Sequence, residues 1–361
     1  MALTNARTGL TPQQWDDKFF MEYVRENRFK RYMGTDENSI IQLKEDLSKK
    51  KGDKVTFAAV NKLAGSGVTG NTTLEGNEES LDTRSMAVTV APLRHAVAVT
   101  NWDEQKSTVE LRDTAKMALK LWAMEKMKTG IIDALGSING IAYGSASEAQ
   151  KDAWLVDNAD RVLFGASKSN ASSNDHSTSL ANIDNTSDKL TTASISLMKR
   201  IAQTASPAIR PIRLNEDEEW FVLFANSRAF RDLNESSAMQ QANRDARARG
   251  VESNPLFTGG SLVWDGVIIR EIPEISVLSG VGAGAIDVAP VYLCGAQAIG
   301  LAWAQRTKTT TQVSDYGFRN GVGVQEMRGI EKLIFGSGSG DTDDLKDHGV
   351  VTGFFAAVAD A

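Results

Sequence analysis

Little in the 361-residue sequence supports catalysis or metal binding. The single cysteine, Cys294, excludes an intramolecular disulfide and any cysteine-cluster metal site. The three histidines, His95, His176 and His348, lie in three different segments and form neither an HxxxH nor an HExxH pair, so no zinc site is expected. A GxSxG nucleophile elbow and a GxxxxGKS or GxxxxGKT phosphate loop are also missing. The sequence therefore predicts no enzyme activity and no cofactor.

An excess of basic residues and long apolar runs are missing as well. The chain has 46 acidic and 40 basic residues and a formal net charge of −6, whereas a dedicated nucleic-acid binder normally has a basic surface. No apolar run approaches the length of a membrane span. Residues 1–17 lack the basic-then-apolar layout of a signal peptide. We therefore expect a protein that is made and kept in a cytoplasm.

Residues 61–81, NKLAGSGVTGNTTLEGNEESL, contain the pattern GxGxxG at Gly65, Gly67 and Gly70. In a dinucleotide-binding fold, such glycines turn a strand into a helix whose N-terminus holds a pyrophosphate. The residues after Gly70 include β-branched side chains and a further glycine, with no apolar repeat at helical spacing. Without a helix there are no convergent N–H groups, and the nearby carboxylates would repel a phosphate. The pattern therefore predicts a glycine-rich loop and not a nucleotide site.

Two β arms are predicted on either side of this loop. The first arm spans residues 53–60, and the second spans 86–99, where apolar residues alternate and the phase shifts at Ala91-Pro92. A bulge or an edge position is expected there, because proline cannot donate to a β ladder. Each arm has one apolar stripe and no core beneath it, and an isolated hairpin is only marginally stable in water. Something outside the arms must cover them.

Residues 107–136 give the clearest helix signal. Ser107 and Glu110 form a capping box, and Gly136 supplies a stop. At about 1.5 Å per residue, a helix of roughly 28 residues is about 42 Å long and can serve as a spine. Its apolar residues are expected on one broad face: Leu111, Ala115, either Ala118 or Leu119, Trp122, Met117, Leu121, Met124, Ile131, Ile132 and Leu135.

The remaining segments are less regular. Thr11-Pro12 predicts the start of an N-terminal helix that carries aromatic residues at a spacing of four, Trp15, Phe19 and Tyr23. Whether this stripe packs on its own domain or on a neighbouring subunit stays open. Residues 140–190 are polar and irregular, and residues 191–361 combine short helices with β segments.

Four stretches carry a resemblance to a known family: residues 61–81, Arg94-His95-Ala96-Val97, NPLFTG at 254–259 with Trp264-Asp265-Gly266, and Asp347-His348-Gly349-Val350. With the order of the segments, they make the chain similar to the major capsid proteins of tailed bacteriophages, which have the Hong Kong 97 (Johnson) fold. The nearer likeness is to the podophage N-four-like subgroup. The match runs from about Trp15 to the end of the sequence, and residues 145–190 depart from it most.

The resemblance implies an α+β fold and a head-shell function. Many copies would assemble as hexamers and pentamers into an icosahedral shell around double-stranded DNA. Portal, scaffolding and decoration proteins would be partners, DNA would be touched non-specifically at the inner surface, and no membrane would be involved. The protein would be found in the virion, after assembly in the cytoplasm of the bacterial host. The implied divisions are an N-terminal arm at 1–52, an extended β-hairpin loop at 53–100, a peripheral domain at 101–190, a mostly axial domain at 191–330, and C-terminal strands at 331–361 that return to the peripheral domain.

Two other classes are alternatives at this point. A surface-layer or tail-tube protein would form sheets or tubes, and a β-rich hydrolase would need carboxylates clustered in a cleft. On the capsid hypothesis, the expected assembly contacts are Trp15, Phe19, Tyr23, Gly65, Gly67, Gly70, Leu74, Glu75, Glu78, Glu79 and Arg94. The expected structural residues are Ser107, Glu110, Trp122 and Gly136.

Overall fold

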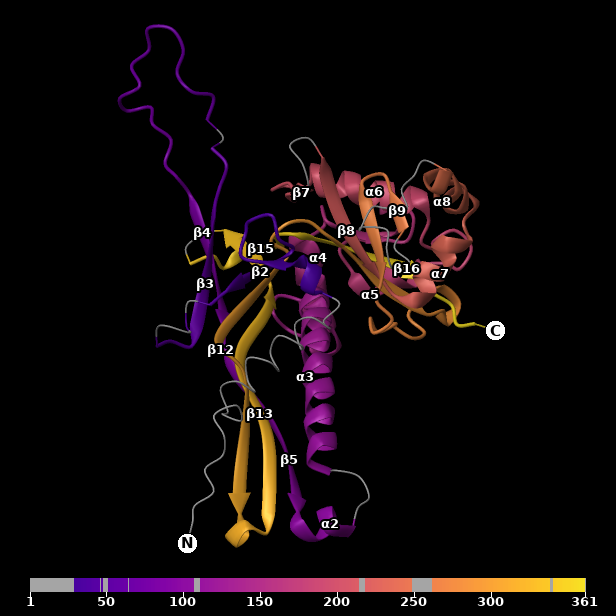
Figure 1. Cartoon of the computed structure of the whole chain (residues 1–361). Coiled ribbons are helices and arrows are strands. Elements are labelled where there is room, and N and C mark those ends of the chain that lie inside the picture. The colour runs from indigo at the N-terminus through magenta and orange to yellow at the C-terminus, as the bar shows by residue number, and fades with distance from the viewer. Residues whose placement is uncertain are drawn as a thin grey trace.

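The computed structural model describes residues 29–45, 47, 51–63, 65–106, 111–213, 218–248, 262–337 and 340–360, without the side chains of 243–248. These residues form an elongated lobe built on a long helix and a second lobe built on a seven-stranded sheet, and a loop projects away from both (Figure 1). The expected N-terminal stripe of Trp15, Phe19 and Tyr23 lies outside the described residues, as do Ser107 and Glu110.

The elongated lobe pairs the long helix α3 (Leu111–Gly136) with a five-stranded sheet of order β1-β2-β12-β13-β5. A short helix, α2 (Asn101–Lys106), lies at its far end (Figure 1). The first half of α3 packs on the sheet through Leu119, which contacts Val322 and Val324. The strands are β1 (Met33–Gly34), β2 (Ile41–Lys44), β12 (Ile299–Ser314), β13 (Arg319–Lys332) and β5 (Ala91–Thr100).

The apolar face of α3 is narrower than the sequence indicates. Leu119 is buried together with Ala115, Ile131 and Leu135, as expected. Met117 and Leu121, however, are 67% and 53% exposed and lie away from this face. The sequence predicted one broad stripe because helical spacing shows which apolar residues lie on neighbouring faces but not which face is buried. In the structure, one apolar stripe packs on the core and a second one lies on the surface.

The second lobe is a mixed sheet of order β6-β16-β11-β8-β10-β9, with β7 paired to β8. Alternate residues of β8 face opposite layers. Phe221 and Leu223 pack with α6, and Val222 and Phe224 pack with the second half of α3. The strands are β6 (Val162–Phe164), β16 (Val350–Ala356), β11 (Val288–Cys294), β8 (Glu219–Ala225), β10 (Val267–Glu271), β9 (Leu262–Trp264) and β7 (Ile212–Arg213). The helices of this lobe are α4 (Glu148–Asp157), α5 (His176–Ala181), α6 (Thr192–Thr204), α7 (Ser227–Glu235) and α8 (Ser237–Ala248).

Two expectations from the sequence differ from this arrangement. The C-terminal strands were expected to return to the domain of the long helix, but β16 pairs with β11 and β6 inside the seven-stranded sheet. Residues 140–190 were expected to be irregular, but they contain α4, β6 and α5 around a core that includes Trp154, Phe164 and Phe354. These short elements were hidden in a polar stretch because their apolar residues are few and widely spaced, and they pack on one another and on later strands only in the folded chain.

The β arms also pair differently from the expected single hairpin over 53–100. Strands β3 (Lys54–Val60) and β4 (Thr83–Thr89) pair with each other in antiparallel register. Strand β5 follows directly after Val90 and pairs with β13 along its whole length. The phase shift expected at Ala91-Pro92 therefore marks the passage of the chain from one sheet to another. A remaining two-stranded sheet joins β14 (Ile334–Ser337) and β15 (Asp343–Asp347).

A buried ion pair joins the end of β13 to the end of β15. The Lys332 ammonium donates to Asp347 Oδ2 at 2.6 Å, and each side chain is 1% exposed. The Trp154 indole N–H donates to the same carboxylate oxygen at 3.3 Å, while the backbone N–H of Asp347 donates to Asn158 Oδ1. One end of the elongated lobe is therefore fixed to α4 and to the chain that follows it.

His176 lies in an aromatic cage within the seven-stranded lobe. The rings of Tyr143, Trp154, Phe164 and Phe354 surround its imidazole, which is fully buried. Burial lowers the pKa of His176 to about 4, although the Glu148 carboxylate opposes the decrease. Imidazole Nδ1 has no hydrogen-bond partner among the described residues, and the Glu148 carboxylate oxygen lies 3.8 Å from it.

This cage makes the stability of the chain dependent on pH. The pKa of His176 is about 4 in the folded chain and near 6.5 when unfolded, so the unfolded chain binds more protons between these values. As pH falls from 6.5 towards 4, the free energy of unfolding should decrease by up to about 1.4 kcal/mol per pH unit from this group. Urea unfolding at pH 7, 6 and 5 would measure the slope, and His176→Phe should reduce it. Equal slopes for the two chains would show that His176 is protonated without penalty.

Candidate assembly surfaces

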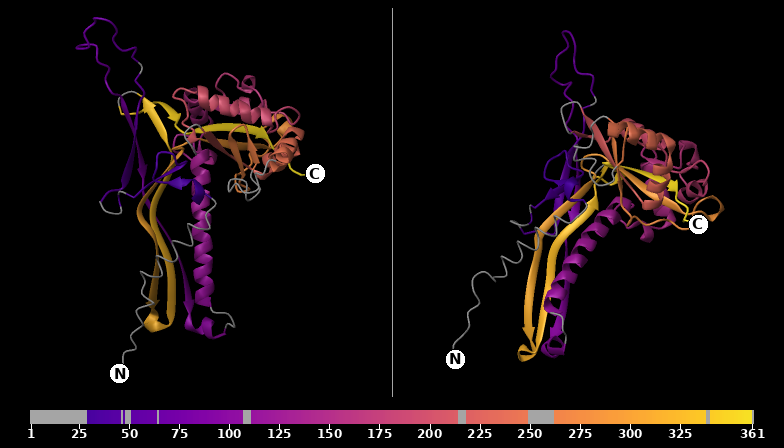
Figure 2. Two further views of the ribbon diagram at one scale, coloured as in Figure 1. Left: turned by 45° about the horizontal axis from the view of Figure 1, so that its top comes forward. Right: turned by 45° about the vertical axis from the view of Figure 1, so that its right-hand side comes forward.

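The loop between β3 and β4, residues 61–82, contributes nothing to the core. Almost all of its described side chains are exposed, and it stands clear of both lobes in three views (Figures 1 and 2). Its hydrogen bonds stay within the loop: the Gly65 N–H donates to Glu79 Oε2 at 2.7 Å and the Gly76 N–H donates to Glu78 Oε2 at 2.7 Å. The loop therefore has local order and no packing partner among the described residues.

The glycines of GSGVTG fit a loop conformation. Gly67 and Gly70 have φ values of 68° and 70°, in the left-handed region that favours glycine, and both face open space. Gly65 has no such conformation, but an added Cβ would lie 2.6 Å from Glu79 Oε2. Residues 71–82 continue as turns and extended chain without a helix, so the dipole and N–H groups of a phosphate site do not form here.

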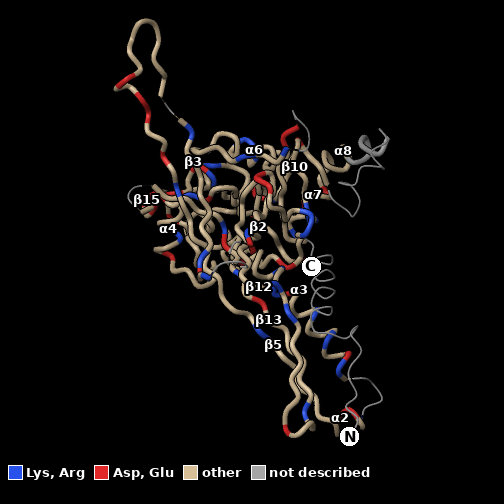
Figure 3. Tube along the Cα trace, turned by 60° about the vertical axis from the view of Figure 1, so that its left-hand side comes forward, with Lys and Arg blue, Asp and Glu red and all other residues tan. Residues whose placement is uncertain are grey.

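The loop is both apolar and acidic along its length. Leu63, Leu74 and Leu81 are more than half exposed, which is a large apolar content for a segment without a core. Four carboxylates and one lysine also lie between residues 61 and 82, and Figure 3 shows the acidic positions along the loop. The carboxylates belong to Glu75, Glu78, Glu79 and Asp82.

The other expected residues lie apart from this loop. Arg94 is exposed on β5, opposite Gln325 of β13. Trp122 is half-buried on α3, and its ring lies 4.7 Å from that of His95. Gly136 ends α3, and a Cβ there would lie 2.7 Å from the Tyr292 hydroxyl oxygen, so the helix end approaches β11 closely. The loop residues and Arg94 thus belong to separate surfaces of one chain.

Sequence reasoning missed a second exposed apolar cluster, at the far end of the elongated lobe. Strands β12 and β13 form one long hairpin whose turn carries Tyr316, fully exposed with φ 49°, and Phe318. Trp102 of α2 is exposed near this turn, where the Asn101 side chain donates to the Gly317 carbonyl at 2.8 Å. The signal in the sequence was the Asp315-Tyr316-Gly317 turn between two alternating runs, which predicts a hairpin.

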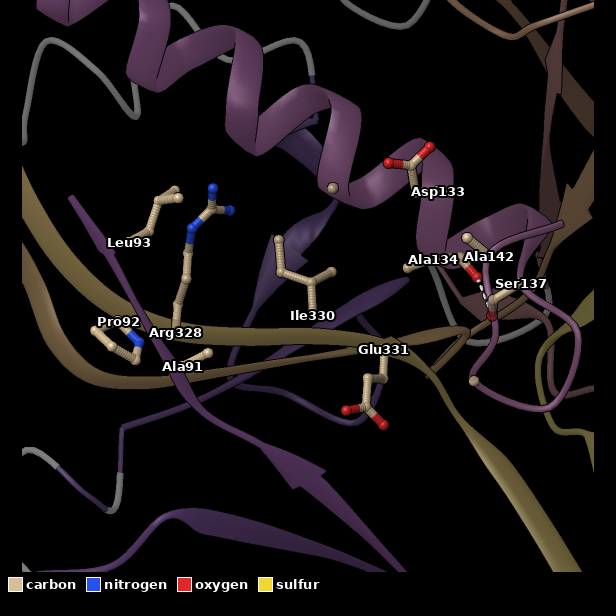
Figure 4. Close-up of a pocket in the computed structure, with 12 residues that line it drawn as sticks. Ala91, Pro92, Leu93, Asp133, Ala134, Ser137, Ala142, Arg328, Ile330 and Glu331 are labelled. Atoms are coloured by element: carbon tan, nitrogen blue, oxygen red, sulfur yellow. Dashed lines mark hydrogen bonds between the residues drawn. The ribbon is translucent and has the colours of Figure 1, made fainter. Parts of the chain in front are cut away.

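A cavity of about 360 Å³ lies between α3 and the start of β5 (Figure 4). Arg328 and Ile330 point from β13 towards α3, and Asp133 projects from the helix (Figure 4). Arg328 donates to Glu326 Oε1 at 2.6 Å, and burial raises the pKa of Asp133 while Lys126 opposes the rise. The only hydroxyl in its lining is that of Ser137, which donates to the carbonyl of Ala134.

Neither a metal site nor a membrane-spanning helix is found in the parts of the chain that the structure describes. No group of three or more His, Cys, Asp or Glu side chains there could hold a metal ion. None of the described helices is both long enough and apolar enough to cross a bilayer. Exposed apolar surfaces on thin, projecting elements are the features that stand out, and they are typical of subunits that pack against one another.

Comparisons with known proteins agree with this geometry. The family model described as "Phage capsid protein" matches residues 4–358, and the chain therefore belongs to the phage capsid protein family. The major capsid protein of Pseudomonas phage KPP25 is 27% identical over 95% of this chain and 94% of its own length. The capsid asymmetric unit of cyanophage Pam1 is 40% identical, with a TM-score of 0.83 and full coverage of both chains.

The fold is shared more widely than the sequence. The capsid of Ralstonia phage GP4 superposes with a TM-score of 0.74 over 93% of this chain and 92% of its own, at 23% identity. The chain is thus a phage major capsid protein with the Hong Kong 97-type α+β fold, a structural protein of the virion that self-assembles into a lattice.

Proposed function

We propose that each element of the fold has a distinct role in an icosahedral head shell that encloses double-stranded DNA. The elongated lobe acts as the peripheral domain, and the seven-stranded lobe acts as the axial domain near the five- and six-fold centres. The part of the chain before Phe29 acts as an arm that contacts a neighbour, and the loop at 61–82 reaches over another subunit. The rest of the expected arm at 1–52 is in part built into the subunit itself, since Ile41–Lys44 pair with β12. The main support for the proposal is the exposure of the apolar side chains of the loop at 61–82, which have no packing partner among the described residues of the chain.

The role is mechanical and not catalytic. A shell under internal pressure is held by the burial of surface between subunits and by the pairing of strand edges. Strand β5 is an edge strand of the five-stranded sheet, so one side of its backbone is available for such pairing. The net charge of −6 suits this role, since a strongly basic lining would hold the genome tightly and hinder its packaging and release.

Further partners follow from the same role. Portal and scaffolding proteins would direct assembly in the cytoplasm of the bacterial host, decoration proteins would bind the outer surface, and DNA would touch the inner surface without sequence specificity. The likeness to podophage N-four-like capsids belongs to this proposal, and the relatives described above support it at the level of the capsid.

Electron microscopy of assembled particles tests the proposal. We expect closed shells in which residues 61–82 of each subunit lie over an adjacent subunit, with the seven-stranded lobe nearest the five- and six-fold axes. A shell in which this loop folds back onto its own subunit would contradict the proposed role of the loop. Open sheets or tubes in place of closed particles would contradict the head-shell proposal.

A further inference from the structure

A second cavity, of about 240 Å³, lies at the junction of the two lobes. The last turn of α3 and Lys332 of β13 line it from the elongated lobe, and the paired strands β11 and β16 line it from the seven-stranded lobe. The end of α3 meets the seven-stranded lobe at this place (Figure 1). A molecule held in this cavity would therefore contact both lobes at once.

The cavity has a buried floor and an exposed mouth. Each residue of the floor is at most 5% exposed: Trp154, Tyr292, Lys332, Thr352 and Phe354. The residues of the mouth are all exposed: Asp133, Ala142, Gly144 and Ser276. A small molecule can therefore enter from solvent and reach the floor without the unfolding of either lobe.

Two hydroxyl groups on the floor lack a hydrogen-bond partner in the part of the chain that the structure describes. They belong to Tyr292 and Thr352, which lie directly opposite each other on β11 and β16 and so share one face of the sheet. Gly136 makes room for the first of them, because a Cβ there would lie 2.7 Å from the Tyr292 hydroxyl oxygen. A buried hydroxyl without a partner is unfavourable, so these two are expected to bind something that enters the cavity.

The charges around the floor favour an uncharged ligand. The Lys332 ammonium already donates to Asp347 Oδ2 at 2.6 Å, and the two side chains together are neutral. An anion would add an unpaired charge near the carboxylates of Asp347 and Asp133, and a cation would approach Lys332. Burial raises the pKa of Tyr292 far above its usual value, so its hydroxyl stays neutral and can donate.

The walls and the volume favour an aromatic ring. Trp154 and Phe354 present aromatic surface on the floor, and aromatic rings pack well against one another in edge-on or offset arrangements. Tyr143 lines the cavity too, but its hydroxyl already lies 3.3 Å from His176 Nε2. A cavity of about 150 Å³ holds benzene, so the present one has room for a ring with a short side chain, roughly nine non-hydrogen atoms.

We propose that this cavity binds a small uncharged aromatic alcohol, with its ring against Trp154 and Phe354 and its hydroxyl bonded to Tyr292 and Thr352. The inference goes beyond the role in the shell and gives the subunit a ligand site. Because the ligand would contact α3 and the seven-stranded sheet together, its binding should stabilise the folded subunit.

Three molecules of nearly equal size test the class of ligand. 2-Phenylethanol, 2-phenylethylamine and propylbenzene end in a hydroxyl, an ammonium and a methyl group. Calorimetric titration of the unassembled chain should give a Kd of roughly 100 µM for the alcohol. Propylbenzene should bind about tenfold more weakly, and the amine should give no measurable heat. At about a hundred times its Kd, the alcohol should raise the melting temperature by about 5 °C.

Two variants test the place of binding. Tyr292→Phe removes the hydroxyl and keeps the ring, so it should weaken the alcohol about tenfold and leave propylbenzene unchanged. Without ligand, this variant should melt no lower than the original chain, because its hydroxyl has no partner to lose. Ala142→Phe fills the mouth and should abolish binding. Its matched control, Ala118→Phe, places the same side chain at an exposed position of α3 outside the cavity and should leave binding unchanged.

Several results would overturn the proposal. No heat from the alcohol would show that the cavity holds only water, and equal affinities for the alcohol and propylbenzene would show that the two hydroxyls take no part. Binding that survives both Tyr292→Phe and Ala142→Phe would place the alcohol elsewhere on the chain. None of these results bears on the head-shell proposal, which the form of the assembled particles tests separately.

Discussion

Asp347→Ala is expected to leave little folded protein, because it isolates the buried ammonium of Lys332. The two side chains are each 1% exposed, and they form a 2.6 Å ion pair to which the Trp154 indole also donates. Removal of one partner from such a pair typically lowers the free energy of unfolding by about 3–5 kcal/mol, since the remaining charge cannot be solvated. Soluble yield and the urea midpoint of the unassembled chain would measure the loss.

A double variant is the matched control for this experiment. Lys332→Met with Asp347→Leu removes both charges and keeps apolar bulk, so it should cost much less than Asp347→Ala alone. Equal losses for the single and double variants would show that packing, and not the isolated charge, is responsible. A single variant as stable as the original chain would mean that Lys332 finds another partner or reaches water.

Excision of the projecting loop should abolish shell formation while leaving the subunit folded. In this variant, residues 63–80 are replaced by a short glycine–serine linker between β3 and β4. The hydrophobic core does not include residues 61–82, so the melting temperature of the unassembled chain should stay nearly the same. Particle yield by sedimentation should fall to background, since each subunit loses its contact over a neighbour.

A milder change in the same loop provides the control. Thr72→Ala with Thr73→Ala alters two exposed polar side chains but keeps the acidic and apolar residues of the tip, so particles should still form. Normal shells from the excised chain would remove the loop from the assembly contacts. A large drop in its melting temperature would instead show that the loop supports its own subunit.

Local features of the fold could be predicted from the sequence where they depend on neighbouring residues. The stop of α3 at Gly136 was visible in a short stretch, and the structure confirms it. The prediction that no helix follows the glycine-rich segment is likewise confirmed, because the absence of a helical repeat is a local property of residues 71–82.

Pairings between distant segments could not be predicted in this way. Strand β5 pairs with β13 more than two hundred residues later, and nothing within residues 91–100 distinguishes that partner from β3. The exposed positions Met117 and Leu121 illustrate a related limit. An apolar residue that contacts another subunit and an apolar residue that is buried in the core occur at the same helical spacing, so the sequence alone does not distinguish them.

The place of β16 has a consequence for the synthesis of the protein. This strand lies between β6 and β11, and all its residues are buried, so the seven-stranded sheet is divided until Val350–Ala356 arrive. A chain broken off before Val350 leaves the partner edges of β6 and β11 open and cannot present a finished lobe to its neighbours. We therefore expect subunits that are interrupted before Val350 to be incorporated poorly into particles, because their seven-stranded sheet is incomplete.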